Sequence, residues 1–408
     1  MTLKASERQG ARSATGRAVA INGATLVAHA MRQVHPDVVA CYPITPQTII
    51  TETFSEFVAN GQVQTEFVAV ESEHAAMSVC IGSAAAGART QTATSGPGLA
   101  LMWELLWVAS GSRLPIVMHL CTRALSAPLN ILCDHSDVMG ARDTGWPILF
   151  SEDGQEAYDN AIQAVRVAEH PDVLLPVIST QDGFTITHGI ERAEILDDAS
   201  VRSFVGEYSS HRPLLDVEHP TTYGAWDYHD YYFEHKRQQA DAMEKALGVI
   251  EAVGKEFGKM SGRPYGLVQP YRLDDAEFAV VVLGSAAGTL RSVVDDLRSR
   301  GVKAGMLRVR VLRPFPMKAV AEALKGVKVA AVLDRAFAFG APAGALFGDV
   351  SVSLAVNGGG PRLVNYVYGL GGRDTLPEQF MTAFDDIRRI AKGASVQPVV
   401  RYLGLHEG

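Results

Sequence analysis

The sequence has no excess of basic residues. In 408 residues, 37 lysines and arginines are outnumbered by 45 aspartates and glutamates, which gives a formal net charge of −8. A chain with this balance offers no basic face for a phosphate backbone, so we expect no nucleic-acid partner. Long apolar runs are also missing: residues 99–109 form a short run that contains Glu104, and no membrane span is predicted. Residues 1–17 are polar, without the apolar stretch of a secretory signal, and we therefore expect a cytoplasmic protein.

Cysteine is scarce. The four cysteines, Cys41, Cys80, Cys121 and Cys133, include no Cys-x-x-Cys pair, which argues against a zinc site or an iron–sulfur cluster held by this chain alone. Their apolar neighbours indicate buried, reduced thiols that serve packing. Hydrophobic residues make up 47% of the chain and charged residues 20%, so a large core and two or three domains are expected.

The first half of the chain alternates short apolar runs with helical patterns. Strands are predicted at 38–42, 67–70, 90–94, 116–120 and 173–180, and the run at 67–70 has the composition of a buried strand. Helices are predicted after a cap at Asn22 and at 47–57, 74–86, 99–110 and 155–169. This rhythm is typical of an α/β domain with a parallel sheet.

The second half changes in texture. Residues 223–228 are aromatic and polar, and either form a partner surface or wrap the first domain; a long helix follows them. Strands are then predicted at 278–283, 304–311, 327–333 and 362–366, and a helix at 377–391. We divide the chain into an N-terminal arm (1–19), a first domain (20–206), a linker with the long helix (207–274) and a second α/β domain (275–408).

The second domain has two glycine-rich stretches, and the first of them loosely resembles a phosphate-binding loop. Residues 284–289 lack the glycine spacing of a dinucleotide site and the Lys-Ser/Thr of a P-loop, so close packing of a strand on a helix is the better interpretation. The stretch 369–374 receives no role from the sequence.

Polar residues follow the predicted strands of the first domain. Thr45 comes after the first of them, Glu71 and Glu73 after the second, and Arg123 after the strand at 116–120. In a parallel sheet with helices on both faces, ligands bind beyond the carboxyl ends of the strands. We therefore predict a site at this edge.

Each of these motifs also has a purely structural interpretation. The turn Thr94-Ser95-Gly96-Pro97-Gly98 suits an anion or polar ligand, but also simple packing. Arg123 suits a bidentate grip on a carboxylate, although structurally paired arginines are common. Asp134-His135-Ser136-Asp137 has the residue types of a metal or acid–base cluster; without a second histidine at ligand spacing, we favour a structural network and predict no metal site.

Five motifs together resemble a known family. Tyr-Pro-Ile-Thr-Pro (42–46), Glu-Ser-Glu-His (71–74), Arg-Ala-Leu-Ser-Ala-Pro (123–128), Asp-His-Ser-Asp (134–137) and Arg-Asp-Thr-Gly-Trp (142–146) resemble, in order and spacing, the α subunit of pyruvate:ferredoxin oxidoreductase. Leu-Arg-Pro-Phe-Pro (312–316) is similar to its second domain. The resemblance spans residues 20–395 and implies a thiamine diphosphate-binding, pyrimidine-type parallel-sheet domain followed by a smaller transketolase-C-like α/β domain.

The resemblance also implies an activity. Such enzymes use thiamine diphosphate to decarboxylate a 2-oxoacid, pass electrons through [4Fe-4S] clusters to ferredoxin, and transfer the acyl group to coenzyme A. The α chain would share the thiamine diphosphate with a β subunit that holds Mg²⁺, in a complex with γ and δ subunits. The sequence agrees with this division, because it has neither a Gly-Asp-Gly magnesium motif nor a cysteine ladder.

The resemblance implies roles for single residues. Glu73, with Glu71 as the fallback, would bind N1′ of the pyrimidine and favour its imino tautomer, although a helix-capping role is the alternative. Pro43, Ile44 and Ser95 would also contact the cofactor. Thr45 and Arg123 would bind the substrate, and a threonine at position 45 fits the monoanion pyruvate better than the dianion oxalate.

Two alternatives stay open. The substrate could be 2-oxoglutarate or a branched-chain 2-oxoacid, because part of the pocket wall belongs to other subunits, or oxalate, which Thr45 fits less well. The chain could also be a non-catalytic assembly subunit, although the joint presence of Thr45, Glu73 and Arg123 counts against that.

Overall fold

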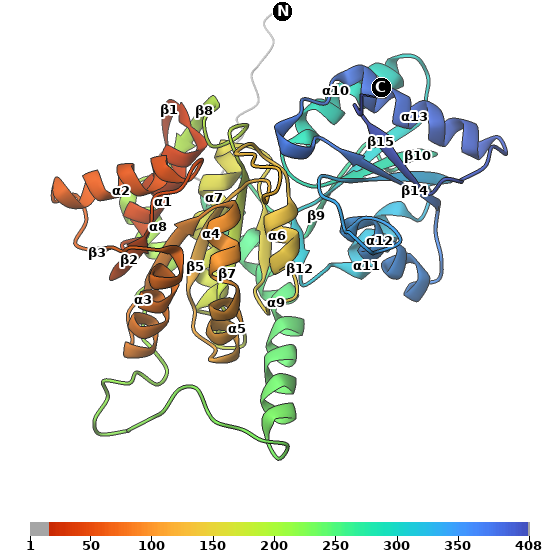
Figure 1. Cartoon of the computed structure of the whole chain (residues 1–408). Helices are drawn as coiled ribbons and strands as arrows, with labels where there is room; N and C mark the ends of the chain where they lie inside the picture. Colours follow the sequence, from red (N-terminus) through yellow and green to blue (C-terminus); the bar gives the residue numbers. More distant parts are fainter. Residues whose placement is uncertain (1–15, 407–408) are drawn as a thin grey trace, which may run out of the picture.

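The apolar runs form two sheets in a computed structural model that describes residues 16–406 (Figure 1). The first sheet has the strand order β12-β6-β7-β5-β4-β2-β3, and its neighbours are parallel except for the antiparallel pair β12 and β6. Its strands are β2 (Val38–Cys41), β3 (Glu66–Ala69), β4 (Thr90–Thr94), β5 (Val117–Thr122), β6 (Ile148–Phe150), β7 (Val177–Asp182) and β12 (Val311–Arg313).

Helices cover both faces of this sheet, as the alternating pattern predicts. They are α1 (Gly23–Val34), α2 (Thr48–Ala59), α3 (Glu73–Ala86), α4 (Gly96–Leu101), α5 (Trp103–Gly111), α6 (Ser136–Ala141), α7 (Gly154–Ala168) and α8 (Asp198–Val205). Successive strand residues point to opposite faces. Val117 joins the core formed with α1 and α7, whereas Met118 joins the core formed with α3 and α5. The predicted cap is present: Oδ1 of Asn22 accepts a hydrogen bond from N of Thr25 at 2.8 Å.

The second sheet has the order β15-β14-β13-β10-β11-β9, with only β9 antiparallel to its neighbour. Its strands are β9 (Val268–Tyr271), β10 (Phe278–Val282), β11 (Ala304–Val309), β13 (Val329–Asp334), β14 (Arg362–Tyr368) and β15 (Val400–Leu403). The helices α10 (Ala286–Ser299) and α13 (Pro377–Ala391) pack on one face, and α11 (Met317–Leu324) and α12 (Ala345–Val356) on the other.

The two domains share structure. Strand β12 lies in the second half of the chain but pairs with β6 of the first sheet. The core beneath α3 and α5 continues into the second domain through Leu307 and Val332. Arg308, which is 3% exposed, adds a buried ion pair across the junction, with Nη1 2.8 Å from Oε2 of Glu156 on α7. The domains are therefore joined by backbone pairing, apolar packing and charge.

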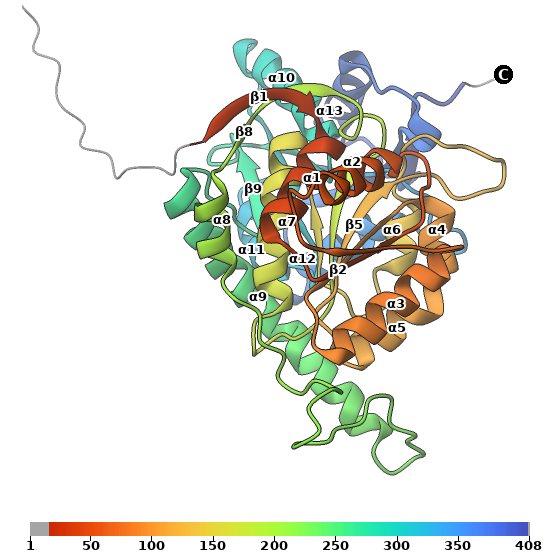
Figure 2. The same cartoon turned by 90° about the vertical axis from the view of Figure 1, so that its left-hand side faces the viewer.

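In the sequence, the two domains are joined by the long helix α9 (Tyr232–Ser261). Its buried face includes Ala246, Ile250 and Phe257, which pack in the core of the first domain. The segment before it leaves the body of the molecule (Figures 1 and 2). Leu214 near its start donates from its N to O of Ala85, whereas Trp226 and Tyr228 are 85% and 68% exposed. The segment therefore wraps the first domain over its first residues and then presents aromatic side chains to solvent.

Three local predictions were wrong. The helix expected at 99–110 is divided at Met102, where N donates to O of both Gly98 and Leu99 and α4 ends. The run at 67–70 is not a buried strand, because β3 lies at the edge of the sheet and none of its residues is buried. The strand expected at 304–311 is two strands, β11 and β12, that join different sheets.

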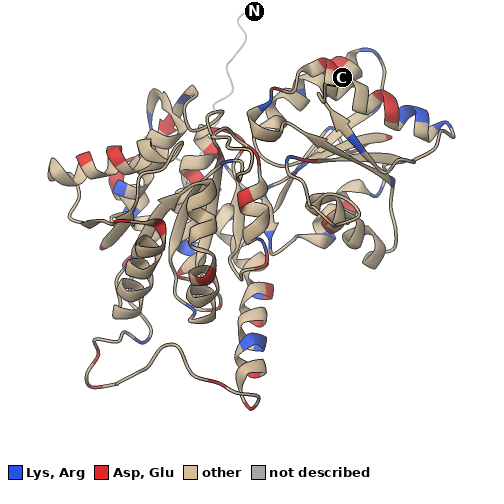
Figure 3. Ribbon diagram, in the orientation of Figure 1, with Lys and Arg blue, Asp and Glu red and all other residues tan. Residues whose placement is uncertain are grey.

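The predicted N-terminal arm, residues 1–19, lies mostly outside the described residues; its last three residues belong to β1 (Arg17–Asn22), which pairs with β8 (Ile190–Ile195). Acidic and basic residues are interspersed along both domains in Figure 3. Within residues 16–406, no helix is long and apolar enough to cross a membrane.

Candidate active site

The predicted site residues follow the carboxyl ends of neighbouring strands. Thr45 lies after β2, Glu73 after β3, Ser95 after β4 and Arg123 after β5. Because these strands are parallel, all four residues lie at one edge of the sheet.

Glu73 opens helix α3 and points into the protein. The preceding Ser72 caps the helix, since its Oγ accepts a hydrogen bond from N of Ala75 at 3.2 Å. Glu73 is only 7% exposed, whereas Glu71 is exposed. Within residues 16–406, the Glu73 carboxylate accepts no hydrogen bond. Capping therefore falls to Ser72, and the buried carboxylate is available for another partner.

The turn between β4 and α4 lies between Glu73 and Arg123. A Cβ on Gly98 would lie 2.7 Å from Oε1 of Glu73, and a Cβ on Gly96 would lie 3.0 Å from Cδ of Arg123. Both glycines therefore let the turn approach these two side chains closely. Gly96 is also required for its positive φ of +44°. On the same turn, Oγ of Ser95 is buried and has no hydrogen-bond partner among the described residues. Such a group suits a polar ligand.

Arg123 is held by two backbone carbonyls. Its Nη1 donates to O of Thr45 at 2.9 Å, and its Nε donates to O of Asn130 at 3.3 Å. Its Nη2 has no hydrogen-bond partner within the part of the chain that the structure describes. An arginine held in this way keeps a cationic nitrogen for an anion, because both of its present partners are neutral carbonyls.

Asp137 ties the turn and the arginine together. Its Oδ2 accepts hydrogen bonds from N of Gly96 at 3.0 Å and from N of Arg123 at 2.9 Å. Burial raises the pKa of Asp137 to about 8, although these backbone donors and N of Val138 act in the opposite direction. The Asp-His-Ser-Asp motif thus contains a structural network, with Asp137 as one of its centres.

The second centre is Asp182 at the end of β7, which the sequence reasoning missed. Its carboxylate accepts from Nε2 of His135 at 2.9 Å, from Oγ of Ser285 at 2.6 Å and from Nη1 of Arg335 at 3.1 Å. Burial alone would raise the pKa of Asp182, but attraction to His135 and Arg335 and the hydrogen bonds hold it below its ordinary value. Since Ser285 and Arg335 belong to the second domain, this buried aspartate is a junction between domains, which no spacing in the sequence signals.

The same junction explains a grouping of possible metal ligands. Single atoms of Cys133, His135 and Asp182 lie within 4.8 Å of one another, and all three residues are buried. The guanidinium of Arg335 already neutralises Asp182, and burial raises the pKa of the Cys133 thiol beyond its ordinary value. This donor set does not suit a cation. The turn at 284–289, interpreted from sequence as simple packing, also has a further role. Gly284 leaves room for the Asp182 carboxylate, and N of Ser285 donates a hydrogen bond to it.

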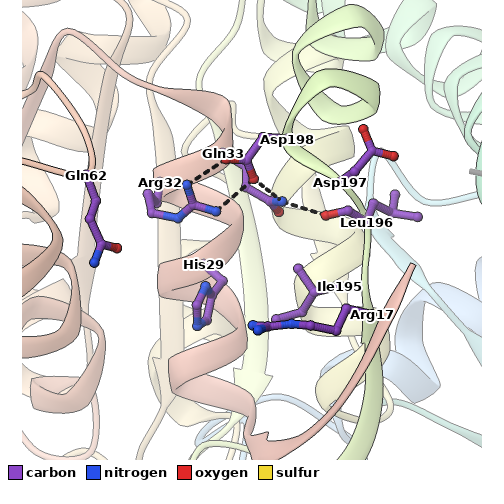
Figure 4. Close-up of a pocket in the computed structure, with 9 residues that line it drawn as sticks. All are labelled: Arg17, His29, Arg32, Gln33, Gln62, Ile195, Leu196, Asp197 and Asp198. Atoms are coloured by element: carbon purple, nitrogen blue, oxygen red, sulfur yellow. Dashed lines mark hydrogen bonds and ion pairs between the residues drawn. The ribbon is translucent and has the colours of Figure 1, made fainter. Parts of the chain in front are cut away.

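A separate hollow of about 580 Å³ lies beside α1 and β8 (Figure 4). Arg32 forms a two-pronged contact with Asp198 there, at 2.8 Å for both nitrogens, which lowers the pKa of Asp198 to about 2. Burial and the charges of Arg32 and Arg17 lower the pKa of His29 to about 4. No predicted site residue lines this hollow, and two of its charged residues, Arg32 and Asp198, pair with each other.

Of the other predicted cofactor contacts, Pro43 and Ile44 share the loop of Thr45. Pro43 is exposed, while N of the half-buried Ile44 donates to Oε1 of Gln47 at 3.2 Å. The structure thus gathers Thr45, Glu73, Ser95 and Arg123 at one edge; the role of each residue stays a prediction.

Comparison with known proteins identifies the two domains. Residues 29–255 match the family model described as pyruvate flavodoxin/ferredoxin oxidoreductase, thiamine diphosphate-binding, and residues 276–380 match that of pyruvate:ferredoxin oxidoreductase core domain II. A parallel-sheet domain of the thiamine diphosphate-binding class is thus followed by a smaller α/β domain, which confirms the predicted fold class.

The chain belongs to the pyruvate:ferredoxin oxidoreductase family, as the five motifs predicted. It is 54% identical over 389 residues to pyruvate synthase subunit PorA of Thermotoga maritima, covering 95% of this chain and 98% of the relative. It is 46% identical to PorA of Methanocaldococcus jannaschii, with 90% and 94% covered. Ketoisovalerate oxidoreductase subunit VorA of Pyrococcus abyssi is 39% identical, with 94% and 97% covered.

Among solved structures, the chain resembles a 2-oxoglutarate:ferredoxin oxidoreductase from Magnetococcus marinus. The TM-score is 0.73 at 18% sequence identity, and the match covers 90% of this chain and 65% of that chain. At this identity, the likeness shows the fold alone.

Proposed function

We propose that this chain is the α subunit of a pyruvate:ferredoxin oxidoreductase that oxidatively decarboxylates pyruvate to acetyl-CoA and CO₂. One observation carries the proposal: a buried carboxylate without a donor and an arginine with an unpaired nitrogen lie on either side of one glycine turn, at the ligand-binding edge of the sheet. The identity of 54% with a pyruvate synthase subunit over nearly the whole chain supports the same conclusion.

The residues present fit the pyrimidine half of thiamine diphosphate. Glu73 would accept a hydrogen bond from protonated N1′, and its burial makes that bond strong, because little water competes for the carboxylate. The buried Ser95 Oγ supplies a further polar contact, and Pro43 and Ile44 would line the ring. When bound, thiamine diphosphate supplies a nucleophilic carbon for attack on the 2-oxoacid carbonyl.

The substrate carboxylate would bind Arg123. Thr45 is exposed at the same edge, and its carbonyl already accepts a hydrogen bond from Nη1 of Arg123, so the two residues are neighbours. One arginine and one threonine balance the single charge of pyruvate, whereas a dianion would require a second cation. Binding through these two groups would orient the carbonyl for attack.

The chain would work only within a complex. The described residues contain no group of acidic side chains suited to Mg²⁺ and diphosphate, and the four cysteines are buried, free and dispersed. We assign Mg²⁺ and the [4Fe-4S] clusters to β, γ and δ subunits in the cytoplasm, with coenzyme A as co-substrate and ferredoxin as acceptor. The exposed Trp226 and Phe233 supply apolar surface for such partners.

A branched-chain 2-oxoacid is the second candidate substrate, because the VorA relative matches 94% of the chain, about the same share as the PorA relatives, at 39% identity. The test is to purify the complex from its native source and to measure acyl-CoA formation and ferredoxin reduction with pyruvate, 2-oxoisovalerate, 2-oxoglutarate and oxalate. We expect the highest kcat/KM with pyruvate. A higher kcat/KM with another acid would make that acid the substrate in place of pyruvate. Activity with none of the four acids would overturn the proposed function.

A further inference from the structure

The loop that begins at Arg123 reaches the second domain at its far end. N of Gly372 donates to O of Cys133 at 2.6 Å, and Nδ2 of Asn130 donates to O of Gly371 at 3.0 Å. N of Gly371 lies 3.3 Å from Oδ2 of Asp134. These contacts join residues about 240 positions apart and place the short helix η1 (Leu370–Gly372) directly on the loop.

Two glycines make this approach possible. A Cβ on Gly371 would lie 2.4 Å from Nδ2 of Asn130, and a Cβ on Gly372 would lie 2.4 Å from Cβ of Leu132. Both glycines also have positive φ values, +56° and +75°. Any other residue would strain the backbone and push the loop away. The glycine-rich stretch that the sequence left without a role is thus shaped to receive residues 130–134.

Asn130 connects this contact to the active site. Its O accepts the hydrogen bond from Nε of Arg123, while its amide holds Gly371 and its Oδ1 accepts from N of Leu132 at 2.7 Å. The guanidinium is therefore fixed by one carbonyl from the β2 loop and by a second carbonyl whose position depends on the second domain.

We propose that the turn at 370–372 is a positioning element, which sets the orientation of Arg123 through Asn130 and so tunes binding of the 2-oxoacid carboxylate. The inference rests on the proposed function, because it needs Arg123 to bind substrate. Neither Asn130 nor the turn touches substrate; both act through the arginine. A misplacement of about 1 Å at such a group costs on the order of a hundredfold in rate, so a modest shift has a measurable effect.

The first test is Asn130→Asp in the assembled complex. Aspartate keeps an oxygen for N of Leu132 but replaces the donor that faces O of Gly371 with an acceptor. We expect the KM for pyruvate to rise about tenfold, with kcat within about threefold of the unchanged enzyme. The affinity for thiamine diphosphate should not change, because Glu73 and Ser95 are untouched. A loss that was merely structural would instead lower assembly and cofactor binding together.

The second test is Gly372→Ala, matched by Gly301→Ala. The two glycines have nearly equal φ values, +75° and +76°, but nothing lies within 4 Å of a Cβ on Gly301. The two variants therefore share the backbone strain, and only the first displaces the loop. We expect a raised KM in Gly372→Ala alone. If both position-130 and position-372 variants fail to assemble while Gly301→Ala assembles, the turn holds the fold rather than the arginine, and the inference is overturned.

A double variant separates this inference from the proposed function. In an Arg123→Ala background, Asn130→Asp should raise the KM by less than about twofold, because the group through which it acts is gone. A full tenfold effect there would refute the positioning role. If Arg123→Ala itself leaves the KM unchanged, the substrate role of Arg123 fails; if it raises the KM while the variants at 130 and 372 do not, only the positioning inference fails.

Discussion

Replacement of Glu73 by glutamine tests the centre of the proposed site. Glutamine has nearly the same volume, so the buried position next to Gly98 stays filled and no cavity forms. The change removes the negative charge and replaces one of the two carboxylate oxygens facing the pyrimidine with an amide donor. Because an uncompensated buried carboxylate costs free energy, stability of the variant should be equal to or greater than that of the unchanged protein.

The magnitude follows from the role assigned to Glu73. Positioned acid–base groups contribute about 10²- to 10⁴-fold, which corresponds to about 3 to 5 kcal/mol of the activation free energy. We expect a loss of this size in kcat of the assembled complex, with a small change in KM for pyruvate, since Arg123 and Thr45 remain.

The assay compares Glu73→Gln with Glu71→Gln, the same substitution two residues earlier at an exposed side chain. Both complexes are checked for assembly by size-exclusion chromatography and for thiamine diphosphate binding by titration. Glu71→Gln should retain turnover. Turnover of Glu73→Gln within about threefold of the unchanged complex would refute the reasoning, since a positioned acid–base group contributes far more. A loss only in Glu71→Gln would move the role to that residue.

Three further outcomes are expected. Arg123→Ala should raise the KM for pyruvate by the equivalent of about 2 to 4 kcal/mol. The control is Arg113→Ala, which also removes an arginine bonded to backbone carbonyls and should leave the KM unchanged. Equal effects of the two substitutions would contradict the substrate role of Arg123. Gly98→Ala should lower kcat by displacing Glu73, whereas Gly82→Ala, with no atom near its Cβ, is the control; similar activity of the two would argue against close packing at Glu73. The pKa of Asp182 is depressed on folding, so its stabilisation is present at neutral pH and is lost as the pH falls below the ordinary carboxyl value of about 4. Asp182→Asn should therefore lower the thermal midpoint at pH 7, by the equivalent of about 3 to 5 kcal/mol. The difference in thermal midpoint between the variant and the unchanged protein should become smaller in acid; a difference that does not change with pH would contradict the depressed pKa of Asp182.

The site residues at the edge of the sheet could be predicted because each lies next to its own strand in the sequence. Glu73 and Arg123 each follow an apolar run directly, and period and composition place such runs in a parallel sheet. Pairwise contacts across the chain could not be predicted in this way. Two examples are the hydrogen bond from Arg123 to the carbonyl of Thr45 and the one from Ser285 to Asp182. Both depend on how loops far apart in the sequence come together.

Strand assignment failed where the partner decides the outcome. Residues 67–70 are apolar enough for the interior, yet β3 is the last strand of its sheet, and no strand among residues 16–406 pairs with its outer edge. Residues 304–311 contain no turn signal that would divide them, although Arg308 and Arg310 interrupt their apolar pattern, but β11 and β12 pair with different sheets. In both cases tertiary pairing overrides the local pattern.

The pairing of β12 with β6 has a consequence for dissecting this protein. A fragment truncated before residue 311 would expose the backbone N–H and C=O groups along one side of Ile148–Phe150, three residues that are fully buried in the intact chain. Such an open, apolar rim recruits strands from other molecules. The amino-terminal half expressed by itself would therefore tend to precipitate, and a gene split between the two family domains would require both products to be made together.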